Sequence, residues 1–215
     1  MKRIIPFAIL LMFIISCAKD GTKNKWMDYY NRYFSTADKA SLDSALFYID
    51  KEMKDDPEEK WLLYSYKLTI FSIQQEYDKA LSTCFNDTVV IDERFPFFQQ
   101  IIKERFLAMK AQYHHNDEER NHYLMETMKT IGNYMTHNGN EMASFLDKRK
   151  SKEQIDGHFI LLRYYFLSKT IVDGKNATLL SLDSLYKIHQ NMDCYDELHK
   201  LITDFSEEDL LQFSL

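Results

Sequence analysis

Apolar residues recur at helical spacing along most of the chain, and this periodicity constrains the fold more than any other feature of the sequence. Steps of three and four residues place such side chains on one face of a helix. Clear examples are Leu63/Tyr66/Ile70/Ile73, Phe98/Ile102/Phe106/Met109/Tyr113, Leu124/Met128/Ile131/Met135 and Ile155/Phe159/Leu162/Phe166. The 215 residues include 5 Gly and 3 Pro, too few for the turns of a β-sandwich or barrel. The sequence therefore predicts an all-α fold.

The breaks between these stripes carry residues that end helices. Asp55-Asp56-Pro57 ends one helix, because the residue before a proline is disfavoured in the α conformation. Residues 85–96 form a longer connection, in which Val89-Val90-Ile91 is compatible with a short extended piece. Gly139 is suited to a left-handed cap after His137. We expect antiparallel helices joined by links short enough that sequence neighbours pack together.

A third break, at Asp173-Gly174, precedes the C-terminal part of the chain. Thr178 or Ser181 is the expected N-cap of the helix that follows. Leu182, Leu185 and Met192, then Leu198 and Ile202, predict two shorter helices there.

Two sets of residues resemble tetratricopeptide repeats. The first set is Ala45, Ile49 and Pro57, at the spacing of a repeat's second helix, and the next is Tyr64, Phe71 and Ala80. Ala45 and Ala80 are 80 − 45 = 35 residues apart, close to the family period of about 34. A small side chain at these positions lets two helices approach closely.

The match to this family is incomplete. Lys67-Leu68 stands where the family has Leu-Gly, and Arg120 stands where a third small residue is expected after Leu107-Ala108. The resemblance implies a short right-handed array of helical hairpins over residues 26–137, a connection at 138–154, and C-terminal helices at 155–215 packed on the same array. Generic packing of helical hairpins is the alternative.

The N-terminus has the features of a signal peptide. Lys2 and Arg3 precede an apolar run over residues 4–15. As a helix, twelve residues would span roughly 18 Å, whereas the hydrocarbon core of a bilayer is about 30 Å thick. The run is therefore too short to cross a membrane.

The end of this run, Ile14-Ile15-Ser16-Cys17, resembles the lipobox of bacterial lipoproteins. The resemblance implies that residues 1–16 are cleaved and that Cys17 carries a diacylglyceryl group and an acylated amine, with palmitate as a typical acyl chain. Several acyl chains hold a protein stably at a membrane. The alternative is an ordinary secretory signal with an incidental cysteine.

Residues 17–25 are polar and suit a short tether. Ala18 replaces the Asp that retains enteric lipoproteins at the inner membrane, which favours the outer membrane. Lys19-Asp20 is a faint version of the acidic cluster that exports some lipoproteins of the Bacteroides group to the cell surface.

The charge of the mature chain argues against nucleic acid as a partner. Without Lys2 and Arg3 it has 27 − 2 = 25 basic and 33 acidic side chains, a balance of −8. Apart from Cys17, the cysteines are Cys84 and Cys194, and the sequence does not decide between a disulfide and two buried thiols.

Motifs for catalysis, cofactors and metals are missing from the sequence. His114 and His115 are separated from His122 by a predicted connection at Asn116-Asp117, so we expect solvated histidines rather than a metal site. No Gly-rich phosphate loop or nucleophile elbow occurs. We therefore expect no enzyme and no cofactor.

Three segments resemble the Asp-Ser/Thr-apolar sites that Bacteroides-type bacteria O-glycosylate in exported proteins. They begin at Asp43, Asp87 and Asp183. We expect Ser44 and Ser184 at or inside helix starts, where Asp and Ser cap backbone N–H groups, so Thr88 is the possible acceptor.

The many aromatic residues allow two roles. Rings at helical spacing are more often core, although an exposed platform would suit a peptide or a sugar. The aromatic residues concerned are Trp26, Tyr29, Tyr30, Tyr33, Tyr64 and Tyr66.

A helical-hairpin array provides groove surface rather than catalytic geometry. We therefore expect a membrane-anchored module that binds an envelope protein or a peptide. The alternative is a lipoprotein that binds an oligosaccharide or a peptide for nutrient uptake, as in starch-utilisation lipoproteins, which contain similar repeats. An exposed aromatic platform would favour sugar, and a continuous groove would favour a protein.

Overall fold

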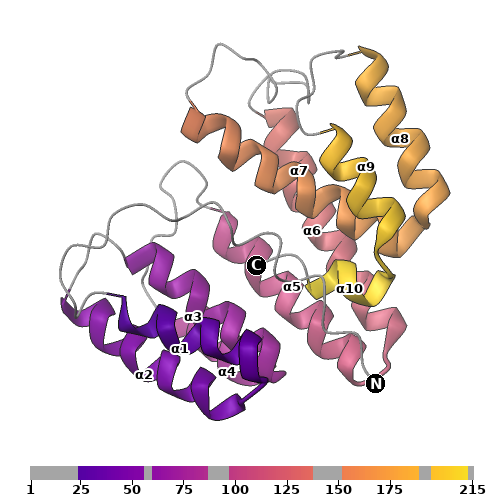
Figure 1. Cartoon of the computed structure of the whole chain (residues 1–215). Helices are drawn as coiled ribbons and strands as arrows, with labels where there is room; N and C mark the ends of the chain where they lie inside the picture. The colour runs from indigo at the N-terminus through magenta and orange to yellow at the C-terminus, as the bar shows by residue number, and fades with distance from the viewer. Residues whose placement is uncertain (1–23, 56–59, 87–96, 138–151, 189–194, 213–215) are drawn as a thin grey trace. The chain divides into compact units, whose positions relative to one another are not determined.

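The computed structural model describes residues 24–55, 60–86, 97–137, 152–188 and 195–212 (Figure 1). Regular structure throughout these ranges is α-helical, with no strand, which confirms the all-α prediction. In the same ranges, no helix combines the length and the apolar character needed to span a bilayer. The chain divides into two compact units, Met1–Gln74 and Gln75–Leu215.

The first unit contains three helices, α1 (Lys25–Thr36), α2 (Lys39–Asp55) and α3 (Lys60–Gln74). Helix α2 packs against both α1 and α3. Its last residue is Asp55, as the downstream Pro57 predicts.

The turn between α1 and α2 is built by Ala37 and Asp38. Ala37 is left-handed, with φ of 55°, and its N–H donates to the carbonyl of Tyr33 at 2.7 Å. Asp38 then caps α2, because its Oδ1 accepts the N–H of Ala40 at 3.1 Å.

Asp43 and Ser44 fall just inside the start of α2, as predicted, but the prediction that they cap this helix is wrong. Both residues lie inside α2, and the Ser44 hydroxyl donates to the carbonyl of Ala40 at 3.0 Å. The physical reason is that Asp38 already accepts the first free N–H, so the helix begins one turn earlier.

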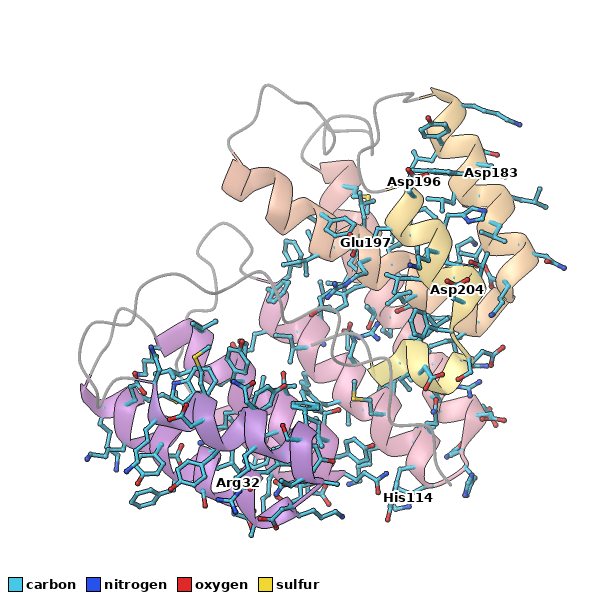
Figure 2. The ribbon with its side chains drawn as sticks, in the orientation of Figure 1. Arg32, His114, Asp183, Asp196, Glu197 and Asp204 are labelled. Carbon is cyan, nitrogen blue, oxygen red and sulfur yellow. The ribbon has the colours of Figure 1, made fainter. Side chains whose placement is uncertain are left out.

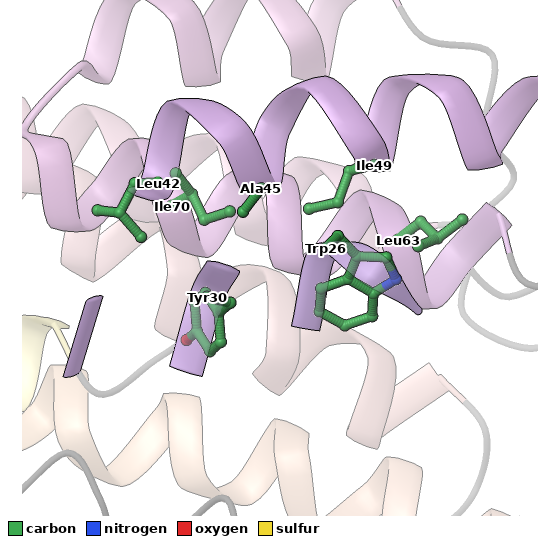
Figure 3. Close-up of a cluster of buried hydrophobic side chains, with 7 residues drawn as sticks. All are labelled: Trp26, Tyr30, Leu42, Ala45, Ile49, Leu63 and Ile70. Carbon is green, nitrogen blue, oxygen red and sulfur yellow. The ribbon is translucent and has the colours of Figure 1, made fainter. Parts of the chain in front are cut away.

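The core of the first unit lies where the three helices meet (Figure 3). Leu42, Ala45 and Ile49 supply the stripe of α2, at steps of three and four residues, and each is fully buried. The small Ala45 side chain lets neighbouring helices approach α2 closely. The remaining buried members of this cluster are Trp26, Tyr30, Leu63 and Ile70.

The second unit contains seven described helices. They are α4 (Tyr77–Asn86), α5 (Phe98–Tyr113), α6 (Asp117–His137), α7 (Lys152–Asp173), α8 (Lys175–Ile188), α9 (Tyr195–Asp204) and α10 (Glu207–Gln212). Each helix from α4 to α8 packs against the next one in sequence. Helix α10 instead returns to pack against α7 and α5. The sequence predicted two helices after Gly174, whereas α8, α9 and α10 are present.

The link between α7 and α8 is a single residue, Gly174, with φ of 86°. Only glycine adopts this conformation without strain. Because α8 begins immediately at Lys175, the prediction that Thr178 or Ser181 caps it is wrong. Thr178 lies in the first turn, and its hydroxyl donates to the carbonyl of Gly174 at 3.0 Å.

Other predicted boundaries fall at or beyond the edges of the described ranges. Helix α6 ends at His137, as predicted, while Gly139 and the connection up to residue 151 lie outside the described residues. The possible extended piece at residues 89–91 also lies outside them. The division between the two units falls within the predicted segment 26–137, and α7 begins three residues before the predicted start at 155.

Candidate functional site

The two predicted modification sites, Cys17 and Thr88, lie outside the described residues. Cys84 is buried in α4, whereas Cys194 is outside the described part of the chain. Lipid attachment, glycosylation and pairing of these two cysteines therefore stay predictions.

Several of the aromatic residues predicted as core are buried in the first unit. Trp26 and Tyr30 of α1 and Tyr64 of α3 are almost completely inaccessible. The ring centroid of Tyr66 on α3 lies 4.4 Å from that of Trp26 and 5.3 Å from that of Tyr30. These contacts join α1 to α3, which confirms the structural role of these rings.

A different aromatic group lies on the surface of α1 and α2. The rings of Tyr29 and Tyr48 stack with centroids 5.4 Å apart and planes 10° from parallel. Phe47 meets Tyr48 edge-on at 5.3 Å, and Lys25 Nζ lies 4.9 Å from the centroid of Tyr48. We call Lys25, Tyr29, Phe47 and Tyr48 the α1–α2 patch.

Phe47 is the most accessible part of the α1–α2 patch. It is 66% exposed, and no other large apolar side chain is exposed among the described residues of the first unit. An exposed phenyl ring loses unfavourable contact with water when another molecule covers it. Phe47 is therefore the strongest candidate contact residue in this unit.

The cations that act on Tyr48 in the α1–α2 patch are Lys25 and Lys51, and the carboxylate of Asp28 acts on Lys25. A hydrogen bond and charge interaction with Tyr48 raise the pKa of Lys25. In return, the hydrogen bond with Lys25 lowers the pKa of Tyr48, as do the charge of Lys25, a hydrogen bond with Tyr29 and the charge of Lys51. The patch thus combines an apolar ring with cations that favour a negatively charged group.

The local sequence explains how these side chains meet. Lys25 and Tyr29 are four residues apart on α1, so they share one face of that helix. On α2, Phe47 is two residues from both Ala45 and Ile49, which places it roughly 200° around the helix from each. It therefore points away from the core.

Sequence reasoning missed Phe47 and Tyr48. The available signal was a large aromatic residue on the face opposite the apolar stripe of its own helix. Tyr29 was identified, but its stacking partner on α2 was not, because the register between two helices is not visible in the period of either one.

The three histidines are separated as predicted, and all are exposed. His114 immediately follows α5 (Figure 2), His115 has φ of 56° in the connection, and His122 lies in α6. The residues that the structure describes include no group of three or more His, Cys, Asp or Glu side chains arranged to hold a metal ion.

Acidic side chains gather where α8 meets α9, at Asp183, Asp196 and Glu197 (Figure 2). The Tyr195 hydroxyl donates to Asp183 Oδ1 at 2.6 Å, and this hydrogen bond raises the pKa of Tyr195 to about 12. The Tyr195 ring also stacks on that of Tyr186 at 4.3 Å. These contacts hold α9 to α8, so Asp183 and Tyr195 have a structural role.

Ser184, in the third predicted glycosylation-like segment, also lies inside a helix. Its hydroxyl donates to the carbonyl of Leu180 at 2.8 Å, so the prediction that it caps a helix start is wrong. Helix α8 begins at Lys175, nine positions before Ser184.

Comparison of the chain with models of protein families, with curated proteins and with solved structures finds no match. The site is therefore interpreted from its own residues.

Proposed function

We propose that the chain is a lipoprotein of the bacterial cell envelope, anchored through lipid on Cys17, whose helices bind a protein or peptide through the α1–α2 patch. Anchoring is supported by Lys2 and Arg3, the apolar run over residues 4–15 and the lipobox-like Ile14-Ile15-Ser16-Cys17. The outer membrane is the favoured location because Asp is absent after the cysteine. The proposal includes no catalytic activity and no cofactor.

The exposure of Phe47 is the observation that carries the binding proposal. Aromatic residues dominate the energy of many protein interfaces, and exposed charges around them set orientation. An apolar side chain of the partner would cover Phe47, while an acidic group would lie near Lys25 and Lys51. The partner best suited to this surface is therefore a peptide segment with adjacent apolar and acidic residues.

The tetratricopeptide-like array is part of the same proposal. It is supported by the complete burial of Ala45 and Ala80, the two small residues of the repeat pattern. Ala45 lies in α2 of the first unit, and Ala80 lies in α4 of the second.

The second candidate function is binding of an oligosaccharide or a peptide during nutrient uptake. The exposed ring of Phe47 favours it, since sugars stack on accessible aromatic faces. Tyr29 and Tyr48 support it less, because each ring already places one face against the other.

The binding proposal is tested by comparing Phe47→Ala with Leu180→Ala. These side chains are 66% and 69% exposed, and Leu180 lies on α8, in the other unit. A photo-crosslinking residue at Ser44, three residues before Phe47 on the same helix, would capture partners in intact cells. We expect Phe47→Ala to reduce the crosslinked product at least tenfold and Leu180→Ala to leave it unchanged.

Equal crosslinking in the original protein, Phe47→Ala and Leu180→Ala would contradict a role for the α1–α2 patch. If no protein is captured, and saccharide binding by the purified protein is lost in Phe47→Ala alone, the second candidate function replaces the first.

A further inference from the structure

The N-terminus of helix α10 is capped by two side chains, each of which accepts a hydrogen bond from the backbone N–H of the other residue. The backbone N–H of Asp209 donates to the hydroxyl oxygen of Ser206 at 3.2 Å, and the N–H of Ser206 donates to Asp209 Oδ2 at 3.3 Å. This is the arrangement of a capping box, with Asp in place of the usual Glu. Two N–H groups that a short helix would otherwise expose to water are satisfied.

The C-terminus of α10 is held by Arg105, which comes from α5. Arg105 Nη2 donates to the carbonyl of Leu211 at 3.3 Å, and Nη1 donates to the hydroxyl of Ser168 on α7 at 3.1 Å. The guanidinium carbon also lies 5.0 Å from the ring centroid of Tyr164. A cation at this end of a helix complements the partial negative charge of its free carbonyls.

Arg105 is 0% exposed, yet it forms no ion pair with any carboxylate in the described part of the chain. Glu104 is its neighbour in sequence, but its carboxylate accepts a hydrogen bond from Gln100 instead. Successive residues of a helix point about 100° apart, so the two side chains diverge. Burial lowers the pKa of Arg105 to about 10, which leaves the guanidinium charged at neutral pH.

A buried cation whose described partners include no carboxylate depends on dipolar groups. Its described acceptors are one serine hydroxyl and the carbonyl of Leu211, while Nε has none. The carbonyl on α10 is therefore an important part of the solvation of Arg105.

Helix α10 is also too short to persist in isolation. It has six residues, and isolated helices below about 12 residues are marginal in water. Leu210 and Leu211 are almost completely buried, and α10 packs against α7 and α5. Folding of this segment and its docking are consequently coupled.

We infer that α10 is a latch: residues 206–212 fold and dock as one unit on Arg105, and they open as one unit. Opening uncovers Arg105, Tyr164 and Ser168 on α5 and α7 while the remaining helices stay folded. This inference does not depend on lipid attachment or on binding at the α1–α2 patch.

Hydrogen exchange measured by mass spectrometry on the full chain tests the latch. The first variant, Arg105→Met, removes the donor but keeps an apolar side chain of similar length. We expect amide exchange in residues 207–212 to accelerate at least tenfold, while exchange in α6 and α8 stays within twofold of the original protein.

A second variant, Ser206→Ala with Asp209→Asn, opens the capping box from the surface and leaves the buried guanidinium in place. It is expected to accelerate the same amides, and it decides the question if Arg105→Met does not fold. The matched control is Ser184→Ala, which removes a surface hydroxyl that bonds within α8 and should leave α10 unchanged.

Two results would overturn the inference. One is unchanged exchange in residues 207–212 when the capping box is removed. The other is an acceleration spread evenly over α5 to α9, which would show that α10 opens only when the whole unit unfolds.

Discussion

At the scale of single residues, the chain tolerates left-handed conformations without glycine. Ala37 has φ of 55° in the turn between α1 and α2, and Gln75 and His115 have φ of 61° and 56°. Side chains with a Cβ atom are disfavoured in this region, typically by about 1 kcal/mol relative to glycine. These positions hold strain that the surrounding helices maintain.

Ala37→Gly is expected to stabilise the protein by about 0.5–1 kcal/mol, because glycine adopts the left-handed turn without the Cβ penalty. Chemical denaturation followed by circular dichroism measures the change. The matched control is Ala40→Gly, an exposed position in the first turn of α2 with no left-handed backbone to relieve, where glycine should not stabilise the protein. Destabilisation by both substitutions would contradict the strain at Ala37.

Glu104 predicts a pH dependence of stability. Its side chain is 5% exposed on α5, and burial raises its pKa above the ordinary value of 4.5. The folded state therefore binds a proton more tightly than the unfolded state. The contribution of Glu104 to stability is fully present below pH 4.5 and is lost as the pH rises through the raised pKa.

Glu104→Gln should remove this loss, because the amide still accepts from Gln100 but carries no charge. We expect the variant to be more stable than the original at pH 7 and close to it at pH 4. Thermal melts at both values measure this. Glu118→Gln, at an exposed position of α6, should leave the pH dependence unchanged. Lower stability of Glu104→Gln at pH 7 would contradict the account.

At the scale of helices, α9 is tied to α8 by one strong polar contact. The Tyr195 hydroxyl donates to Asp183, and this bond raises the pKa of Tyr195 to about 12. Asp183→Asn should lower that pKa toward its ordinary value of 10, measured by NMR titration of selectively labelled tyrosine. Asp196→Asn, which removes only a smaller charge interaction, should lower it less. An unchanged pKa of Tyr195 in Asp183→Asn would show that the Tyr195 hydroxyl is not bonded to Asp183.

Helix positions were largely predictable because the period of apolar residues and the placement of Pro57 and Gly174 act locally. The end of α2 at Asp55 and the end of α7 at Asp173 follow from such signals. The start of α8 was missed because a single glycine turns the chain, which leaves no room for a capping residue.

The candidate site was less predictable than the helices. Tyr29 was recognised as aromatic surface or core, but its stacking on Tyr48 depends on how α1 and α2 are aligned. The burial of Arg105 could not be predicted from the sequence. A charged residue is ordinarily expected to be exposed to solvent, and the burial of Arg105 depends on α7 and α10, which lie far from it in sequence.

At the scale of the whole molecule, the two compact units carry different proposed roles. The first holds the exposed α1–α2 patch, directly after the predicted tether at residues 17–25. The second contains the latch helix α10 and the buried Arg105. Both roles are proposed for a protein held at a membrane by Cys17, so the anchor is the central claim.

Incorporation of labelled palmitate during growth tests this claim most directly, with Cys17→Ser compared with Cys84→Ala. Cys84 is buried in α4, so it should not accept lipid. The account predicts that the original protein and Cys84→Ala carry the label and sediment with membranes, and that Cys17→Ser carries none. An unlabelled original protein, or a Cys17→Ser variant that still sediments with membranes at the mature mass, would contradict it.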